Sequence, residues 1–294
     1  MILIAGCNGH VGREIVKKAA ARNIAARCFD LRPFETAGLE PACLEMFPGD
    51  ITDFEAVRRS TQGVETVLFV LGLKRQTKEL THEKVECGGM QNLIRAAREN
   101  SVKHIMYISA LGVSPDARAS SLIAKWRTEQ MLIESGIAYT IFRPSGYFVD
   151  FAEHFAPRIK ASGKFSVIGN GLTRIQPLAP EDLAEAFIRS MNNPGVINKI
   201  FKISGSEVFT LIDTVQLVGR VVGRTAQVRK LPLPVMKVLF SLMALVTGRR
   251  GLMDFIYRMS RDSVCTDEDV REVREVFDIE FQRLEPWLRE QLSA

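Results

Sequence analysis

The chain has 294 residues, of which 46% are hydrophobic and 25% are charged, and its formal net charge is +5 at pH 7. This composition is typical of a folded globular protein and argues against a disordered or fibrous chain. The positive charge does not gather in a basic tail or an arginine block, so we expect no nucleic-acid partner.

The cysteines and histidines show no pattern of a disulfide framework or a metal site. The five cysteines are odd in number and no two have the C-x-x-C spacing. The four histidines are scattered without the spacing of metal ligands, so we expect no metal. Free cysteines in apolar surroundings indicate a reducing compartment, and we expect the protein to be cytoplasmic.

Short apolar runs alternate with helical patterns through the first half of the chain. The apolar runs predict strands at 2–5, 25–29, 43–47, 66–71, 104–108 and 138–142. The segments between them predict helices at 11–21, 52–60, 81–99 and 119–135. Alternation of this kind implies a parallel sheet with helices on both faces and with ligands at the carboxyl ends of the strands. We therefore predict an α/β fold, a doubly wound parallel sheet of the Rossmann type, over residues 1–150.

The pattern becomes irregular after Pro144. We predict strands at 164–168 and 199–203, helices at 180–191, 210–222, 236–246 and 267–276, and a last helical turn around Trp287. Thr210 and Asp213 have the spacing of a capping box. Because no linker separates the halves, residues 151–294 are predicted to form a smaller α+β cap, interleaved with the Rossmann core.

Three glycines, Gly6, Gly9 and Gly12, follow the first predicted strand at intervals of three and precede a predicted helix. A dinucleotide site at such a turn needs a tight bend, a close approach of the backbone to the pyrophosphate, and a helix packed near its strand. Glycine serves all three needs, although a turn without a ligand is the alternative. We expect the dinucleotide to contact this loop and the ends of the neighbouring strands, at Gly6, Asn8, Gly9, His10, Val11, Gly12, Asp30, Arg32, Asp50, Ile51, Val70, Gly72 and Lys125.

Asp30 and Arg32 leave the choice between NAD and NADP open, with NAD slightly favoured. Asp30 ends the second predicted strand, where a carboxylate accepts hydrogen bonds from the adenosine ribose of NAD. Arg32 is placed to meet the additional phosphate of NADP. Asp50 in GDITD either accepts from an adenine amino group or simply caps a turn.

Several further segments resemble the short-chain dehydrogenase/reductase superfamily. They are the glycine loop, GDITD at 49–53, GMQNL at 89–93, MYISALGV at 106–113 and AYTIFRPSGYF at 138–148. The sequence is most similar to the atypical branch, the NmrA-like and NAD(P)-binding proteins related to NAD-dependent epimerase/dehydratases. The resemblance covers residues 1–150, continues more weakly through LAPED at 178–182, and is not diagnostic beyond 211.

The resemblance implies a catalytic Ser after the fifth strand and a Tyr-x-x-x-Lys on the next helix. Ser109 matches the Ser and Lys125 matches the Lys, but the Tyr position holds Ser121. In the family, the Lys binds the nicotinamide ribose and lowers the pKa of the Tyr through its charge. A serine hydroxyl is much less acidic than a phenol, so this departure argues against ordinary alcohol oxidation and sugar epimerisation. Ser109 as a loop cap and Lys125 as a solvated lysine are the alternatives.

Three functions remain open at this stage. The first is an NAD(P)H-dependent oxidoreductase that reduces a hydrophobic carbonyl or a quinone-like small molecule, with Lys125, the substrate or water handling the proton. The second is a non-catalytic, NmrA-like dinucleotide sensor with a protein partner. The third is a nucleotide-sugar epimerase or dehydratase in which Tyr147 replaces the missing Tyr, although Tyr147 also fits a packing role where the chain enters the cap.

The sequence VMKVLFSLMALV at 235–246 is apolar nearly all round and is followed by Arg249 and Arg250. It is too short to span a bilayer as a helix and it contains Lys237. It fits a buried cap helix, a homo-oligomer interface, a wall of an apolar pocket, or a contact of residues 235–250 with a membrane surface or a protein.

Overall fold

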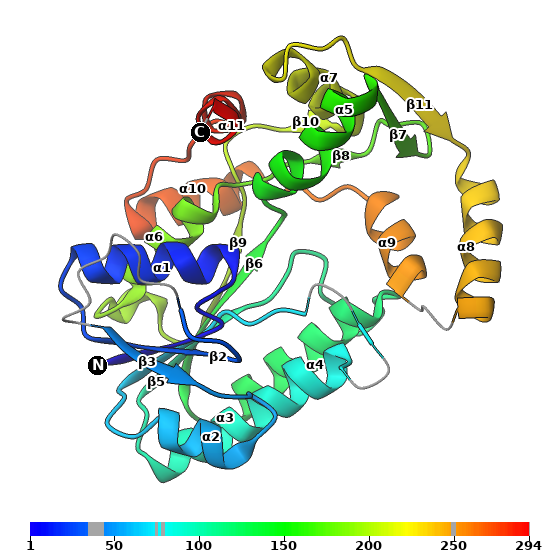
Figure 1. The fold of residues 1–294 in the computed structure, drawn as a ribbon. Helices are drawn as coiled ribbons and strands as arrows, with labels where there is room; N and C mark the ends of the chain where they lie inside the picture. Colours follow the sequence, from blue (N-terminus) through cyan, green and yellow to red (C-terminus); the bar gives the residue numbers. More distant parts are fainter. Residues whose placement is uncertain (35–43, 74–75, 78–79, 248–250, 294) are drawn as a thin grey trace.

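The computed structural model describes residues 1–34, 44–73, 76–77, 80–247 and 251–293. Seven parallel strands form the main sheet, in the order β3-β2-β1-β4-β5-β6-β9 (Figure 1). Their bounds are β1 Ile2–Ala5, β2 Ala26–Asp30, β3 Leu44–Pro48, β4 Thr66–Phe69, β5 His104–Ile108, β6 Ala138–Pro144 and β9 Lys199–Ile203. This arrangement confirms the predicted doubly wound α/β fold, and Cys43, the predicted start of the third strand, lies outside the described residues.

The strands are parallel because a helix carries the chain back between most of them. The central strands β1, β4 and β5 are mostly apolar, as a sheet covered on both faces requires, and every residue of β5 is buried. The outer strands β3 and β9 also carry charged residues. One face carries the helices α1 His10–Ala21, α6 Pro180–Ser190 and α10 Asp267–Phe277. The other face carries α2 Phe54–Ser60, α3 Gly88–Glu99 and α4 Ser120–Glu134. A hydrophobic core lies on each side of the sheet.

The second half of the chain contributes to the sheet as well as to the cap. Strand β9 pairs with β6 in parallel register, with Phe142 opposite Phe201. Helix α6 packs against α1, the helix that follows the glycine loop. Residues beyond 150 therefore build the cap and also add strand β9 and helix α6 to the sheet domain.

The cap lies over the carboxyl edge of the sheet and has its own apolar core around Phe148, Val215 and Trp287 (Figure 1). Its elements are η3 Phe151–Phe155, α5 Ala156–Ser162, β7 Lys164–Ile168, β8 Arg174–Ile175, β10 Phe209–Thr210, α7 Leu211–Val221, β11 Gln227–Leu231, α8 Leu233–Thr247, α9 Gly251–Met259 and α11 Leu284–Ser293. The short turn η4 Pro194–Val196 precedes β9 and packs in the core of the sheet domain. The capping box of Thr210 and Asp213 is present at the start of α7. The sequence patterns missed α5, α9 and β11, because short elements buried on one side have little periodicity of their own.

The predicted helix at 81–99 is present but irregular at its start. Its first turn is the π-helical segment η2, Glu83–Cys87, and α3 continues from Gly88. A π-turn rotates the side chains that precede it relative to those that follow, and such turns are frequent at functional sites. Here it carries Glu86, which is buried beneath the carboxyl end of β5.

Candidate functional site

The glycine loop uses its three glycines for two different purposes. Gly6 has φ +100°, and a Cβ on it would lie 2.8 Å from Leu71 N. A Cβ on Gly12 would lie 2.1 Å from Gly6 O, so α1 can pack against the loop only with glycine there. Both glycines are therefore required by the fold. A Cβ on Gly9 would have one close neighbour, Gly6 O at 3.3 Å, and Gly9 is exposed.

Gly9 is also the N-cap residue of α1, directly before its first residue His10, and no side chain caps this end of the helix. Backbone N–H groups at a helix amino end, together with the helix dipole, attract a phosphate. An open glycine at that point lets a phosphate approach the backbone closely. The loop therefore has the geometry that a dinucleotide pyrophosphate requires.

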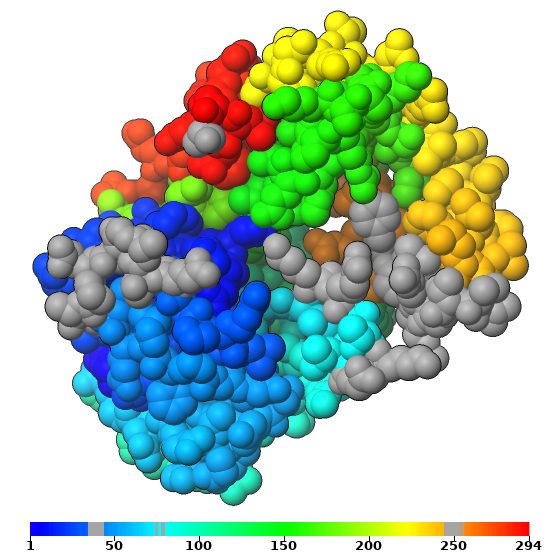
Figure 2. Space-filling view, in the orientation of Figure 1, coloured from blue at the N-terminus to red at the C-terminus, as the bar shows by residue number. Residues whose placement is uncertain are grey.

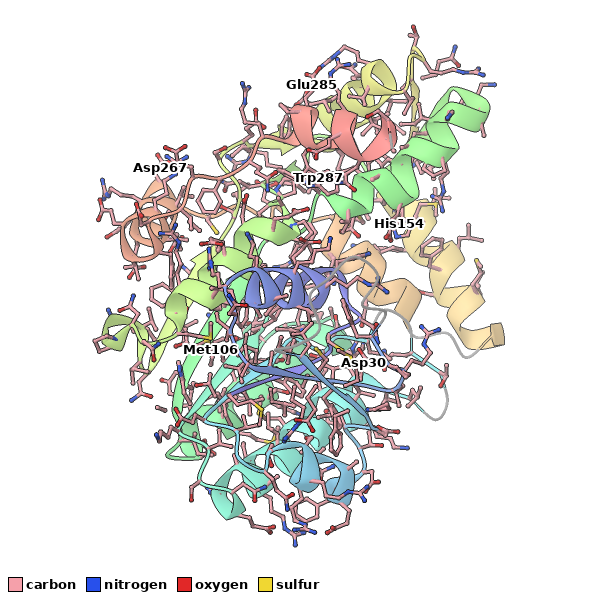
Figure 3. The ribbon with its side chains drawn as sticks, turned by 60° about the vertical axis from the view of Figure 1, so that its left-hand side comes forward. Asp30, Met106, His154, Asp267, Glu285 and Trp287 are labelled. Atoms are coloured by element: carbon pink, nitrogen blue, oxygen red, sulfur yellow. The ribbon has the colours of Figure 1, made fainter. Side chains whose placement is uncertain are left out.

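Asp30 anchors the glycine loop to the end of β2. Its Oδ2 accepts a hydrogen bond from Asn8 N at 3.1 Å, and its Oδ1 accepts one from Leu31 N at 2.8 Å. The side-chain amide of Asn8 donates to Arg32 O at 2.9 Å. Asp30 and Arg32, the residues predicted to contact the adenosine ribose or its phosphate, thus both lie beside the glycine loop. Figure 3 shows Asp30 at the end of its strand and His154 of the cap above it.

The predicted residues at the ends of β3 and β4 border the same edge of the sheet. Asp50 Oδ1 accepts from both N and Oγ1 of Thr52 at 2.8 Å, so this carboxylate does cap a turn. Ile51 is buried, and its carbonyl accepts from the side chain of Asn92 at 3.0 Å. Val70 N donates to Ala5 O at 2.9 Å, and Gly72 is exposed with nothing near its Cβ position.

Ser109 directly follows β5 and is only 2% exposed. Among the described residues, its hydroxyl has no hydrogen-bond partner. A buried hydroxyl without a partner loses its interaction with water and gains nothing in return, and such groups are rare. Ser204, directly after β9, has a second hydroxyl of this kind, so what distinguishes Ser109 is its position at the end of β5, next to the carbonyl that Lys125 contacts.

Lys125 reaches the end of β5 from α4 and is held in a buried ion pair. Its ammonium lies 2.8 Å from Glu86 Oε2 and donates to Ile108 O at 3.1 Å, next to Ser109. Ser109 and Lys125 are thus brought together, as expected. Glu86 was not predicted as a site residue, because its helical sequence pattern gives no indication of an ion pair with Lys125, which lies 39 residues further along the chain.

Glu86 belongs to a larger polar cluster below the sheet edge. His82 Nδ1 lies 3.0 Å from Glu86 Oε1, and the hydroxyl of the fully buried Tyr107 donates to Glu86 Oε2 at 3.3 Å. Burial by itself raises the pKa of Glu86, but Lys125 and His82 outweigh it and hold this pKa below its ordinary value. Glu86 is therefore a carboxylate, and it compensates the charge of Lys125 inside the protein.

The cap helix α9 holds the first turn of α4, where the family has its Tyr. Asp254 Oδ1 accepts from Ser120 N at 3.0 Å, and its Oδ2 accepts from Ser120 Oγ at 2.5 Å and from Ser121 N at 3.3 Å. Ser121 itself is buried. Because Asp254 serves as the acceptor for these N–H groups, the cap fixes the start of α4 beside the predicted catalytic residues.

Tyr147 lies just after β6, where the chain enters the cap. Burial, with a smaller contribution from Asp150, raises the pKa of the Tyr147 phenol well above its ordinary value. Such a phenol is a poor acid and a very poor base near neutral pH. Tyr147 packs partly against the core that also contains α1, in agreement with the packing role left open above.

The cap also contacts the glycine loop directly. His10 Nε2 lies 2.6 Å from Glu153 Oε1 of η3. Asp150, directly before η3, has its pKa raised by desolvation, while His154, Arg258 and His10 oppose this shift. The space between cap and sheet is visible as a hollow in Figure 2. Charged side chains of the cap therefore overlie the region where the glycine loop would hold a phosphate.

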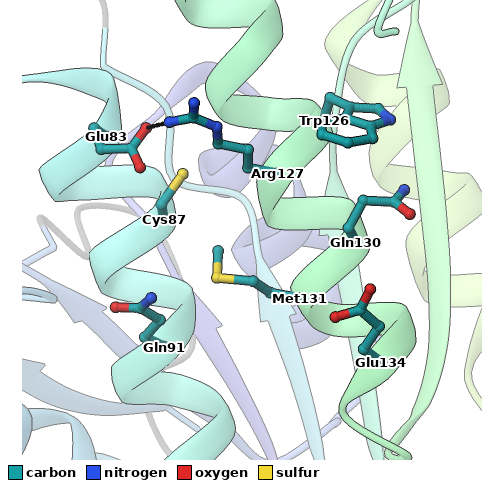
Figure 4. A pocket seen from close by; sticks show the side chains of 8 residues that line it. All are labelled: Glu83, Cys87, Gln91, Trp126, Arg127, Gln130, Met131 and Glu134. Carbon is teal, nitrogen blue, oxygen red and sulfur yellow. Dashed lines mark hydrogen bonds and ion pairs between the residues drawn. The ribbon is translucent and has the colours of Figure 1, made fainter. Parts of the chain in front are cut away.

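A separate groove of about 410 Å³ lies between η2–α3 and α4 (Figure 4). It is lined by Glu83, Cys87, Gln91, Trp126, Arg127, Gln130, Met131 and Glu134. Its Arg127 and Glu83 form an ion pair at 3.1 Å. None of the predicted site residues lines this groove.

Comparison with protein families and curated proteins gives one clear family match. A family described as NAD(P)H-binding matches residues 6–194. The photosystem II assembly factor Ycf39 of Trieres chinensis is 25% identical over 98% of this chain and 92% of its own length. An NAD(P)H azoreductase of Xenophilus azovorans is 24% identical over 88% of this chain and 87% of its own length.

The fold is likewise shared with solved structures. An NADPH-dependent quinone oxidoreductase of Escherichia coli, solved with NADPH, superimposes with a TM-score of 0.78 at 21% identity, over 99% of this chain and 100% of that one. At this identity the likeness speaks for the fold alone. Together, the family match and the shared fold confirm the predicted resemblance to atypical, NAD(P)-binding dehydrogenase/reductases.

Proposed function

This chain belongs to the NAD(P)H-binding family, and from that premise we propose that it is an NAD(P)H-dependent reductase of a hydrophobic carbonyl or quinone-like compound. The observation that carries the proposal is the buried, unpartnered hydroxyl of Ser109. It lies beside the ammonium of Lys125 at the edge of the sheet that also bears the glycine loop.

The residues present fit a dinucleotide, with Gly9 and the amino end of α1 at its pyrophosphate. When bound, the cofactor supplies a hydride. In this proposal the hydroxyl of Ser109 donates a hydrogen bond to the substrate oxygen. Lys125 supplies a nearby positive charge that favours negative charge developing on that oxygen. Because Ser121 replaces the usual Tyr, the proton itself comes from Lys125 or from water.

We propose that NADH is bound in preference to NADPH. The carboxylate of Asp30 ends β2 beside the loop, where it would repel the additional phosphate of NADPH. Arg32 lies close by and is exposed, so it is the residue that would carry a preference for NADPH if one is measured.

The substrate class is supported by the names of two proteins that this chain resembles. One relative is an azoreductase, and one protein of the same fold is a quinone oxidoreductase. Azo compounds and quinones are planar and largely apolar, and both accept a hydride without the phenolic acid of an alcohol dehydrogenase. The proposed reduction likewise needs no phenolic acid, in keeping with Ser121 at the position of the usual Tyr.

A second function is favoured by a specific observation, the charge compensation of Lys125 by Glu86. Without Tyr, and with its lysine paired, the site would serve a protein that binds a dinucleotide without turnover. The likeness to the assembly factor Ycf39 points the same way, towards a protein partner. An epimerase or dehydratase is the third possibility, and the raised pKa of Tyr147 argues against it.

Turnover separates these functions. We expect the purified protein to oxidise NADH with at least one member of a panel of quinones, azo dyes, enones and aldehydes. Ser109→Ala should lower kcat by about a hundredfold or more, the effect of losing one donor to a developing oxyanion. Ser190→Ala is the matched control, because Ser190 is equally buried but donates to Ala186 O on α6. Tight NADH binding without any turnover, together with a protein that copurifies, would replace the reductase with the regulator.

A further inference from the structure

Helix α8 carries an apolar stripe on its outer face. Val235, Val238, Leu239 and Leu242 are spaced as i, i+3, i+4 and i+7, which places them on one side of a helix. They are 59%, 62%, 46% and 57% exposed. Exposed apolar residues scattered singly are ordinary, but a contiguous stripe of them marks an interaction surface.

The opposite face of the same helix is already satisfied by the cap. Met236 is buried and packs with Ile168 of β7 and Ile256 of α9, and Leu233 and Phe240 lie partly buried against them. Packing within the cap therefore accounts for the apolar residues on the inner face of α8, but it does not account for the exposed apolar stripe on the outer face. Figure 1 shows α8 at the margin of the molecule, beyond α9, so the stripe lies on an outer surface.

The chain around α8 is uniformly basic. Between Asp213 and Asp254 the sequence has no acidic residue and seven basic ones, Arg220, Arg224, Arg229, Lys230, Lys237, Arg249 and Arg250. Arg229 and Lys230 are exposed on β11, which leads directly into the helix, and Lys237 is exposed on the helix itself. Lys164 of β7 pairs beside Gln227 of β11 and is also exposed.

The apolar stripe together with the neighbouring basic residues favours an anionic bilayer over a second copy of this chain as the binding partner. A symmetric contact between two copies would bring the same basic surface against itself, and like charges opposed across an interface are unfavourable. An anionic bilayer offers apolar chains to the stripe and negative headgroups to the lysines and arginines. No helix of the described residues is long and apolar enough to cross a membrane, so a contact through α8 would lie on the surface.

We propose that the outer face of α8, with the basic residues of β11, is a docking surface for an anionic lipid bilayer. The stripe enters the boundary between headgroups and acyl chains, and the basic residues hold the protein at the negative surface. This inference stands apart from the proposed reductase function, because it needs neither cofactor nor turnover.

The test is flotation of the full-length protein with vesicles in a density gradient. One set of vesicles contains phosphatidylcholine alone, and the other contains phosphatidylcholine and phosphatidylglycerol in equal parts. We expect the protein to float with the second set only and to be released as salt is raised. Val238→Glu should lower the fraction that floats by about tenfold, because a charge replaces an apolar contact at the interface.

Val208→Glu is the matched control, because Val208 is 52% exposed in the segment before β10, outside α8 and β11. It should float as the wild type does. Lys230→Glu should also weaken binding to anionic vesicles, and the variant should stay folded because Lys230 is exposed. Failure of the wild type to float with anionic vesicles overturns the proposal, and so does equal flotation of Val238→Glu. A wild-type dimer that Val238→Glu converts to a monomer, without vesicle binding, would assign the stripe to a second copy instead.

Discussion

The family resemblance predicted Lys125 as a site residue but did not predict its ion pair with Glu86. Both side chains are largely buried, with 14% of the lysine and 1% of the glutamate side chain exposed. Breaking a buried pair by removing one partner is costly, because the other charge stays behind without compensation. The free energy of unfolding should therefore report directly on this contact.

We expect Glu86→Gln and Lys125→Met each to lower the free energy of unfolding by about 3 kcal/mol. The double variant should lose less than the sum of the two, because it leaves no unpaired charge behind. Urea unfolding of the four proteins measures this coupling. Glu65→Gln is the control, because Glu65 and Lys103 form an exposed pair at 3.5 Å and should contribute less than about 1 kcal/mol. Additive losses in the buried pair would show that Lys125 and Glu86 act independently.

Asp30 should set the choice of cofactor. Asp30→Asn removes the negative charge and keeps one of the two oxygens that accept from the N–H groups of Asn8 and Leu31. The preference for NADH over NADPH should then narrow by about tenfold, which corresponds to about 1.4 kcal/mol. Calorimetric titration of both cofactors measures the ratio. Arg32→Gln should shift the ratio in the opposite direction, and a wild-type preference for NADPH would transfer the leading role to Arg32.

At the scale of elements, the glycines between β1 and α1 differ in what requires them: one is needed for packing within the fold, and another leaves room for the proposed ligand. Gly12 allows α1 to pack on the loop, while Gly9 leaves the amino end of α1 open. The spacing of the glycines is visible in the sequence. Which of them serves packing and which serves a ligand depends on the positions of Gly6 O and Leu71 N, which only the folded chain shows.

We expect Gly9→Val to leave the fold intact and to weaken dinucleotide binding by at least about tenfold, because the side chain fills the approach to the backbone. Gly12→Ala should instead lower the free energy of unfolding by about 1–3 kcal/mol, the usual range for overpacking, or prevent folding. Chemical denaturation and titration with NADH distinguish the two. Unchanged NADH affinity in Gly9→Val would contradict the placement of the pyrophosphate at this loop.

Two of the longer predicted helices have the boundaries that the sequence pattern indicated, whereas the prediction at 236–246 covers only part of α8, Leu233–Thr247. The helices predicted at 11–21 and 119–135 differ from α1 and α4 by one residue at most. The predicted strand at 66–71 is longer than β4, which ends at Phe69, because its last two residues turn into the loop against Gly6. Short cap elements such as β11 and α9 depend on contacts with distant residues, and no local pattern encodes those contacts.

At the scale of the whole molecule, His104 links stability to pH. It lies at the start of β5, is buried, and bonds to Thr140 Oγ1 of β6 at 2.9 Å. Burial lowers its pKa from 6.5 to about 4. The unfolded chain therefore takes up a proton below about pH 6.5 that the folded chain refuses until about pH 4. Stability that is present above pH 6.5 is lost as the pH falls through this window.

We expect His104→Gln, which keeps a polar contact for Thr140 but does not titrate, to lose less stability than the wild type between pH 6.5 and pH 4. The difference should be of the order of 3 kcal/mol. Thermal or urea unfolding across this range measures it. Identical profiles for His104→Gln and the wild type would mean that this histidine is not kept neutral by the fold.

Asp182 acts in the opposite direction over part of the same range. Burial raises its pKa to about 6, although Gln282 donates to it from N at 2.9 Å. The folded chain therefore holds a proton there that the unfolded chain releases above about pH 3.8, and this contribution lowers stability as pH rises towards 6. The two groups partly cancel in the wild type, so the comparison between variants, and not one profile alone, isolates His104.

The sequence by itself determined the doubly wound sheet, the glycine loop, the positions of Ser109, Lys125 and Asp30, and the departure at Ser121. These features are local, because strand and helix periods and turn glycines act over a few neighbouring residues. Tertiary structure alone decided that Glu86 neutralises Lys125, that Ser109 lacks a partner among the described residues, and that β9 joins the sheet beside β6. It also decided that the apolar side chains of α8 divide into an inner and an outer set. Each of these depends on the distance between residues far apart in the chain, and folding sets that distance through packing and not through any local pattern.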